Sequence, residues 1–113
     1  MICRFGDVVV VPFPFVEQPV AKRRPALVLS KEDFNSNSGQ SILAMITSAA
    51  GSSWPSDVTI EDGQSAGLVK RSVLRWKLFT MPNNLIIRKL GKLSTSDEAR
   101  VVDGSMRILP QPA

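Results

Sequence analysis

Two apolar segments near the start of the chain, separated by a short basic stretch, constrain the fold most strongly. Residues 8–15 begin with four consecutive valines, which is typical of a buried strand, and residues 26–29 form a second short apolar run. Between them, Lys22, Arg23 and Arg24 end a polar loop that Pro25 follows. The sequence therefore predicts two strands whose connecting loop holds three adjacent cations at a strand edge.

These cations suit a phosphodiester backbone, because a guanidinium is a planar fork of donors that matches phosphate oxygens. An ordinary solvated loop is the alternative interpretation of the same three residues. The whole chain has a net charge of +4 and a pI of about 9.7. This excess of positive charge permits an acidic partner, such as RNA, DNA or an acidic peptide.

Three further short strands are expected, at residues 42–46, 57–60 and 73–80. The first of them is apolar throughout, so both of its faces should be covered. The last alternates, with Leu74, Trp76 and Leu78 on one face and Arg75, Lys77 and Phe79 on the other. Residues 31–39 are rich in turn formers and are predicted to be irregular, with Phe34 held in the core.

Two helices are expected at the end of the chain. The first covers residues 84–90 and ends at Gly91, a natural C-cap. The second begins at Ser94, with Asp97 completing a sequence that resembles a capping box, and ends at Pro110. Its apolar residues at helical spacing are Ala99, Val102, Met106 and Leu109, and Gly104 weakens it by about 1 kcal/mol relative to alanine.

Many short strands followed by helices predict an α+β fold, built on a small and strongly bent antiparallel sheet. Strands this short close most readily into a partly open barrel. The length of 113 residues indicates one domain over residues 1–113. A single cysteine, Cys3, and no signal peptide suggest a cytoplasmic protein, and residues 8–15 are too few to span a membrane.

The chain has no histidine, which limits its chemistry sharply. It lacks the usual general base near neutral pH, so Ser-His-Asp and Cys-His hydrolases are excluded. One cysteine without histidine also disfavours a zinc site. We therefore expect neither a metal nor a cofactor.

Three polar groups at strand ends or on a strand face are candidates for one binding groove. They are the basic stretch ending at Arg24, the pair Thr47 and Ser48, and the pair Arg75 and Lys77. Phe15 or Trp54 could add base stacking. Each group also has a plainer interpretation: Thr47 and Ser48 as a turn, Arg75 and Lys77 as a solvated strand face, and Trp54 as a core residue under a loop.

These motifs together resemble the MazF/PemK family of toxin endoribonucleases from toxin–antitoxin pairs. The resemblance covers nearly the whole chain and keeps the order of the family's motifs. The matching segments are Gly6-Asp7-Val8-Val9, Pro12-Phe13-Pro14-Phe15, Arg24-Pro25-Ala26-Leu27-Val28-Leu29-Ser30, Ile46-Thr47-Ser48, Ser72-Val73-Leu74 and Leu90-Gly91-Lys92-Leu93-Ser94.

The resemblance implies an SH3-like barrel with a C-terminal helix, usually a homodimer, that cleaves single-stranded RNA at a short sequence without a metal. It also implies an antitoxin whose acidic, extended tail occupies the RNA groove. The family's loop arginine and strand-end threonine fall on Arg24 and Thr47, which would be the catalytic residues. Lys22, Arg23, Ser48, Trp54, Arg75, Lys77 and Phe15 would bind RNA.

The chain departs from the PemK-like branch of this family at Lys77, where that branch has an aspartate used in acid–base chemistry. Either another group acts as the base, or the activity is weak or lost. Two other functions therefore stay open. One is a CcdB-like toxin that inhibits a protein target such as DNA gyrase, and the other is a degenerate family member that only binds RNA.

Overall fold

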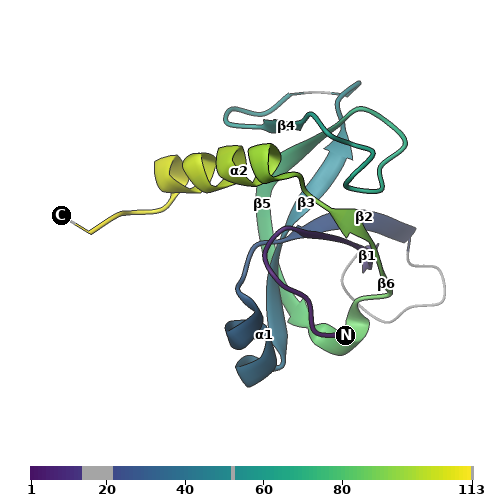
Figure 1. Ribbon diagram of the computed structural model, residues 1–113, viewed down its shortest axis with the longest axis vertical. Coiled ribbons are helices and arrows are strands. Elements are labelled where there is room, and N and C mark those ends of the chain that lie inside the picture. The colour runs from purple at the N-terminus through teal and green to yellow at the C-terminus, as the bar shows by residue number, and fades with distance from the viewer. Residues whose placement is uncertain (14–21, 52, 113) are drawn as a thin grey trace.

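A computed structural model describes residues 1–13, 22–51 and 53–112 (Figure 1). Among them, six strands form one antiparallel sheet in the order β4-β5-β3-β2-β1-β6. The sheet curls into a half-barrel, as expected for an SH3-like α+β fold. The elements are β1 (Asp7–Phe13), β2 (Lys22–Val28), α1 (Glu32–Ser38), β3 (Gln40–Ser48), β4 (Val58–Ile60), β5 (Ser72–Pro82), a 3₁₀ turn η1 (Asn83–Leu85), β6 (Arg88–Lys92) and α2 (Thr95–Ile108).

The apolar strands bury both of their faces, as expected for continuous runs of hydrophobic residues. Neighbouring residues alternate between two buried clusters: Val8 belongs to one and Val9 to the other, as do Ala44 and Leu43. Val101 of α2 joins the cluster that contains Val8. The helix α2 lies across the sheet beside β4, whereas α1 lies next to the start of β3 (Figure 1).

The predicted faces of β5 are confirmed. Leu74 and Trp76 belong to the cluster under α2, while Phe79 packs with the other cluster. The pairing of β5 with β3 shifts in register between Ala44 and Met45, and the partners jump from Leu78 to Arg75. This bulge sharpens the bend of β5, which helps the small sheet to curl.

The segment 31–39 is a helix rather than an irregular turn. Glu32 and Asp33 favour its first turn, and Gly39 ends it with a left-handed φ of 74°. Phe34 is 43% exposed, so the prediction that it is held in the core was wrong. The helix buries Asn35 instead, whose Nδ2 donates to the carbonyl of Cys3 at 2.9 Å.

The helix predicted over residues 84–90 is also wrong. The chain makes only the 3₁₀ turn η1 there and then forms β6, which pairs with β1. Gly91 is therefore a strand residue and not a helix cap. A Cβ at this position would lie 2.5 Å from the carbonyl oxygen of Ser65, so the close approach of two backbones requires glycine.

The N-cap of α2 is as predicted, because the Ser94 side chain accepts a hydrogen bond from the backbone of Asp97 at 3.1 Å. The Asp97 carboxylate, expected to complete a capping box, instead accepts from the backbone of Glu61 and Asp62. Of the apolar residues noted at helical spacing, Val102, Met106 and the C-cap Leu109 are each at least two-fifths exposed, whereas Val101 is buried. No helix within the described residues is both long enough and apolar enough to cross a lipid bilayer.

Candidate functional site

Arg24 and Thr47 line one open groove of about 500 Å³ at the ends of β2 and β3. The β2–β3 ladder reaches Ala26 opposite Met45, and extending this register places Arg24 opposite Thr47. Pro25 has no N–H to continue the ladder. A gap between the strand ends can therefore stay open at this point. The expectation that these two distant residues share a groove is confirmed.

The basic stretch is part of the sheet rather than a loop. Lys22, Arg23 and Arg24 are the first residues of β2 and pair with the end of β1, at Phe13, Pro12 and Val11 respectively. All three side chains are exposed. Anchoring on a strand fixes their backbone, so the three cations are held in place more firmly than a solvated loop would hold them.

Lys22, Arg23 and Ser48 also line the groove, as expected for neighbours of Arg24 and Thr47. Its far wall is the loop before β5, which contributes Leu68, Val69 and Lys70, together with Ser72. Sequence reasoning missed this wall. The signal for it is the Lys70-Arg71 pair immediately before the strand of Val73 and Leu74, since a strand start often brings its flanking residues to the sheet edge.

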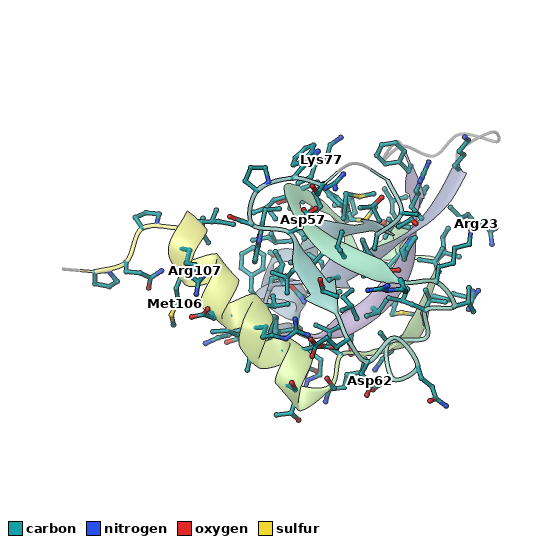
Figure 2. The ribbon with its side chains drawn as sticks, turned by 90° about the horizontal axis from the view of Figure 1, so that it is seen from above. Arg23, Asp57, Asp62, Lys77, Met106 and Arg107 are labelled. Carbon is teal, nitrogen blue, oxygen red and sulfur yellow. The ribbon has the colours of Figure 1, made fainter. Side chains whose placement is uncertain are left out.

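The groove is electrostatically positive. Within the described parts of the chain, no ion pair joins Lys22, Arg23, Arg24 or Lys70 to a carboxylate. Four cations that line one cavity without an anionic partner produce a field that attracts phosphate or carboxylate groups. Figure 2 shows Arg23 projecting from the side of the molecule opposite to Met106 and Arg107 of α2.

Phe13 links the basic stretch to β5. Its ring lies 5.6 Å from the guanidinium carbon of Arg24 and 5.9 Å from the Nζ of Lys77. Both distances are in the range of cation–π contacts. Lys77 thus faces the same aromatic ring as Arg24, although it does not line the groove. The predicted aromatic residue Phe15 lies outside the described residues, and Phe13 was not predicted as part of the site.

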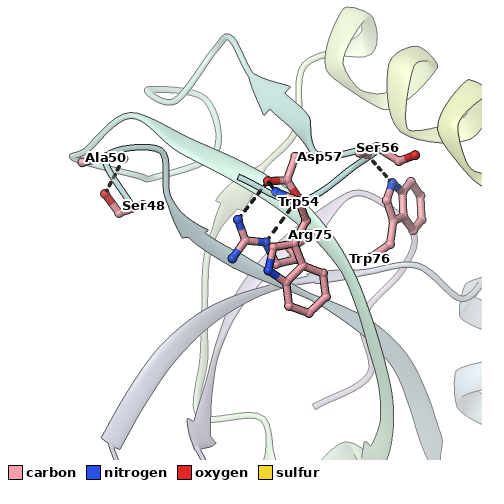
Figure 3. A network of polar contacts seen from close by, with 7 residues as sticks. All are labelled: Ser48, Ala50, Trp54, Ser56, Asp57, Arg75 and Trp76. Atoms are coloured by element: carbon pink, nitrogen blue, oxygen red, sulfur yellow. Dashed lines mark hydrogen bonds and ion pairs between the residues drawn. The ribbon is translucent and has the colours of Figure 1, made fainter. Parts of the chain in front are cut away.

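Trp54, Asp57 and Arg75 form a second cluster, between β4 and β5 (Figure 3). Arg75 donates two hydrogen bonds to the carboxylate of Asp57, from Nη2 at 2.9 Å and from Nε at 3.2 Å. The Arg75 guanidinium lies 4.8 Å from the centroid of the Trp54 ring. The Asp57 carboxylate accepts from the backbone of Trp54 at 3.0 Å, which closes the cluster.

The charges of this pair stabilise each other. The hydrogen bond from Arg75 lowers the pKa of Asp57, and the bond to Asp57 raises the pKa of Arg75. Arg75 is therefore an ion-paired strand residue and not simply a solvated one. Trp54 is 45% exposed, so it is not a core residue under a loop and keeps part of its ring open to solvent.

Residues 4–109 match the family model described as PemK-like, MazF-like toxin of type II toxin–antitoxin system. A comparison with curated protein sequences gives no match.

Among solved structures, the MazE–MazF complex of Deinococcus radiodurans (Form-II) is similar with a TM-score of 0.74 and 23% identity, covering 99% of each chain. The Mycobacterium tuberculosis toxin MazF-mt6 has a TM-score of 0.72 and 21% identity, covering 93% of this chain and 99% of that one. An endoribonuclease in complex with its cognate antitoxin, from a mycobacterial species, has a TM-score of 0.72 and 17% identity over 98% of each chain.

Proposed function

Because the chain belongs to the family of PemK-like, MazF-like toxins of type II toxin–antitoxin systems, we propose that it is an endoribonuclease that cleaves single-stranded RNA at a short sequence, without a metal ion. The observation that carries the proposal is the shared groove of Arg24 and Thr47, whose walls are cationic and open to solvent. Single-stranded RNA suits such an open site better than a duplex, because its unpaired bases are free to contact the protein.

The reaction that suits these residues uses the RNA as its own nucleophile. The 2′-oxygen attacks the adjacent phosphorus while the bond from phosphorus to the 5′-oxygen breaks, which leaves a 2′,3′-cyclic phosphate and a free 5′-hydroxyl. The proton of the 2′-hydroxyl is lost, and the leaving 5′-oxygen gains one. The protein must align the three atoms and stabilise the extra negative charge on the phosphorane.

In this scheme Arg24 binds the phosphate oxygens and stabilises the phosphorane. An arginine guanidinium is in general a poor proton donor, so we give electrostatic stabilisation more weight than proton donation. Thr47 hydrogen-bonds the phosphate or orients the 2′-hydroxyl. Lys22, Arg23 and Ser48, which line the same groove, bind the flanking nucleotides.

The general base is the open part of this scheme, since Lys77 occupies the position where the PemK-like branch has an aspartate. A lysine acts as a base only when its pKa is strongly depressed. Histidine cannot act as the base either, because the chain has none. We propose that Lys77 binds a neighbouring phosphate and that catalysis depends mainly on Arg24 and Thr47. Arg75 was expected to bind phosphate too, but its ion pair with Asp57 and its contact with Trp54 suit it to positioning these two residues.

We also propose two protein partners. The first is a cognate antitoxin with an acidic, extended tail, which would compete with RNA for the cationic groove. In support, a similar structure is that of a mycobacterial endoribonuclease in complex with its cognate antitoxin. The second is another copy of the chain. Val102 and Met106 of α2 and Leu78 of β5 are exposed apolar side chains that a dimer could cover. Light scattering after size-exclusion chromatography would measure the dimer.

The test of the proposed function is incubation of the purified protein with long single-stranded RNA in EDTA. The proposal predicts discrete fragments that end in a 2′,3′-cyclic phosphate, and no cleavage of DNA with the same sequence. A salt-sensitive shift of the RNA without fragments would instead indicate a non-catalytic RNA binder. If the protein neither cleaved nor bound the RNA, the result would favour a toxin that acts on a protein target such as DNA gyrase.

A further inference from the structure

A second cationic pocket adjoins the groove of Arg24 and Thr47. It has a volume of about 470 Å³ and is lined by Ser48, Ala49, Ala50, Lys70 and Arg71. Ser48 and Lys70 also line the groove itself, so the two cavities share one wall. Neither Lys70 nor Arg71 belongs to any motif that the sequence pointed to.

Backbone hydrogen bonds fix the two cations at this place. Ser48 at the end of β3 pairs with Ser72 at the start of β5. One residue further, the N–H of Ala49 donates to the carbonyl of Arg71 at 2.9 Å, and the Ser72 hydroxyl donates to the carbonyl of Lys70 at 2.9 Å. Figure 3 shows the turn at Ser48 and Ala50, where the Ala50 N–H donates to the Ser48 hydroxyl at 3.2 Å.

The chemistry of this pocket suits a continuing polyanion. Lys70 and Arg71 are exposed, and no ion pair joins either of them to a carboxylate within the described residues. Val69, beside them on the wall of the groove, is 98% exposed. Cations next to an exposed apolar side chain match a nucleic acid strand, which presents phosphates and base faces in alternation.

We propose that Lys70 and Arg71 form a second phosphate-binding subsite, which extends the RNA path from Arg24 and Thr47 across Ser48. This inference rests on the proposed function, because it assumes that the groove binds RNA. Its consequence is a dependence on RNA length: an oligonucleotide that fills only the groove contacts Lys70 but does not reach Arg71, whereas a longer one contacts both.

The test compares two mixed-sequence 2′-O-methyl RNAs, of about 4 and about 12 nucleotides, which lie within the range of lengths that small single-strand binding sites cover. The 2′-O-methyl group blocks cleavage, so binding can be measured by fluorescence anisotropy over a range of salt concentrations. The variant is Lys70→Gln/Arg71→Gln. The control is Lys31→Gln/Arg107→Gln, which removes the same charge from exposed positions outside both cavities.

The subsite variant should bind the longer RNA about tenfold more weakly than the wild-type protein, and the slope of log affinity against log salt should fall by about 1.4, or 0.7 for each lost phosphate contact. The shorter RNA reaches Lys70, which also lines the groove, but not Arg71, so it should show about half of each change, and the control variant should show neither. An equal loss for both RNA lengths, or no loss beyond that of the control, would overturn the subsite. Polyglutamate peptide is measured in the same way. If the subsite variant lost affinity for this peptide but not for RNA, the pocket would be assigned to an acidic protein segment and the subsite would also be overturned. A wild-type protein that binds neither RNA would reject the proposed function itself.

Discussion

Arg75 and Asp57 form a two-point ion pair that fixes the segment before β4 against β5. The Nη2 and Nε atoms of Arg75 reach the two carboxylate oxygens at 2.9 and 3.2 Å, and both side chains are about nine-tenths buried. The same guanidinium lies against the ring of Trp54. One face of an exposed indole is therefore occupied by a cation, and the position of the ring depends on a carboxylate three residues away.

Trp54→Ala should weaken the binding of uncleavable single-stranded RNA by about 1–3 kcal/mol, because a stacking platform contributes this much per base. Trp54→Phe keeps an aromatic face and should retain most of the affinity. Fluorescence anisotropy measures both variants, and circular dichroism checks that they are folded. Unchanged RNA affinity in the alanine variant would remove Trp54 from the site.

Asp57→Asn should lower the free energy of unfolding by about 1–3 kcal/mol at pH 7, because the Arg75 guanidinium loses its charged partner. The effect should depend on pH with a definite sign. Arg75 holds the pKa of Asp57 below its ordinary value, so the carboxylate stabilises the fold at pH values above about 4. This contribution is lost as the pH falls through the lowered pKa of the folded protein.

Urea unfolding at a series of pH values measures this dependence. The difference between wild-type protein and Asp57→Asn should be complete at pH 7 and should shrink in acid below about pH 4. A difference that stays constant throughout the acid range would show that the substitution acts through packing and not through the charge of Asp57.

The sequence predicted the strands well where local pattern and burial agree. The valines of β1 and the alternation of β5 are unambiguous, because the same residues that favour a strand also fill the two buried clusters. Local pattern failed where a distant contact decides the structure. Residues 88–92 form a strand because they pair with β1, and α1 is held by a hydrogen bond from Asn35 to Cys3, 32 residues earlier.

Asp97→Asn should lower the free energy of unfolding by about 1–3 kcal/mol. The Asp97 carboxylate is nearly fully buried and accepts from the backbone of Asp62 at 2.9 Å and of Glu61 at 3.2 Å, besides an ion pair with Arg100. Burial alone would raise the pKa of Asp97, but these bonds together lower it, so the carboxylate ties the start of α2 to the loop after β4.

The matched control is Asp103→Asn on the same helix. Asp103 pairs with Arg107 at 2.9 Å, but both side chains are more than half exposed, and exposed pairs contribute about 1 kcal/mol at most. Thermal or urea unfolding should therefore separate the two variants clearly. Equal stability losses would contradict an anchoring role for Asp97.

Gly104→Ala should destabilise the protein, although alanine is favoured over glycine in a helix by about 1 kcal/mol. A Cβ at position 104 would lie 2.9 Å from the ring of Trp76, which is closer than carbon atoms pack. The ring cannot turn away freely, since its Nε1 donates to the carbonyl of Ser56 at 2.8 Å. Gly104 is thus a packing position as well as a weak point of the helix.

A double-mutant cycle with Trp76→Phe tests this contact. The smaller ring should relieve the clash, so Gly104→Ala should cost less in the phenylalanine background than in the wild-type protein. An identical cost in both backgrounds would show that Trp76 is not the residue that excludes a side chain at this position.

The candidate site was predictable only in part. Arg24 and Thr47 are recognisable because each stands at the end of an apolar run, and antiparallel register brings such ends together. Lys70 and Arg71 were missed because the loop that carries them has no periodic pattern. Its position follows from backbone contacts, such as the bond from Lys92 N–H to the Ser65 carbonyl at 3.0 Å, which residue types do not reveal.

The most direct measurement is the initial rate of single-stranded RNA cleavage in EDTA for the wild-type protein, Arg24→Ala and Arg107→Ala. The account predicts that Arg24→Ala reduces the rate at least about 100-fold while the protein stays folded, because a lost transition-state donor costs this much. Arg107→Ala, an exposed arginine on α2, should cleave at the wild-type rate. Cleavage by Arg24→Ala at the wild-type rate would contradict the central role of the groove that Arg24 shares with Thr47.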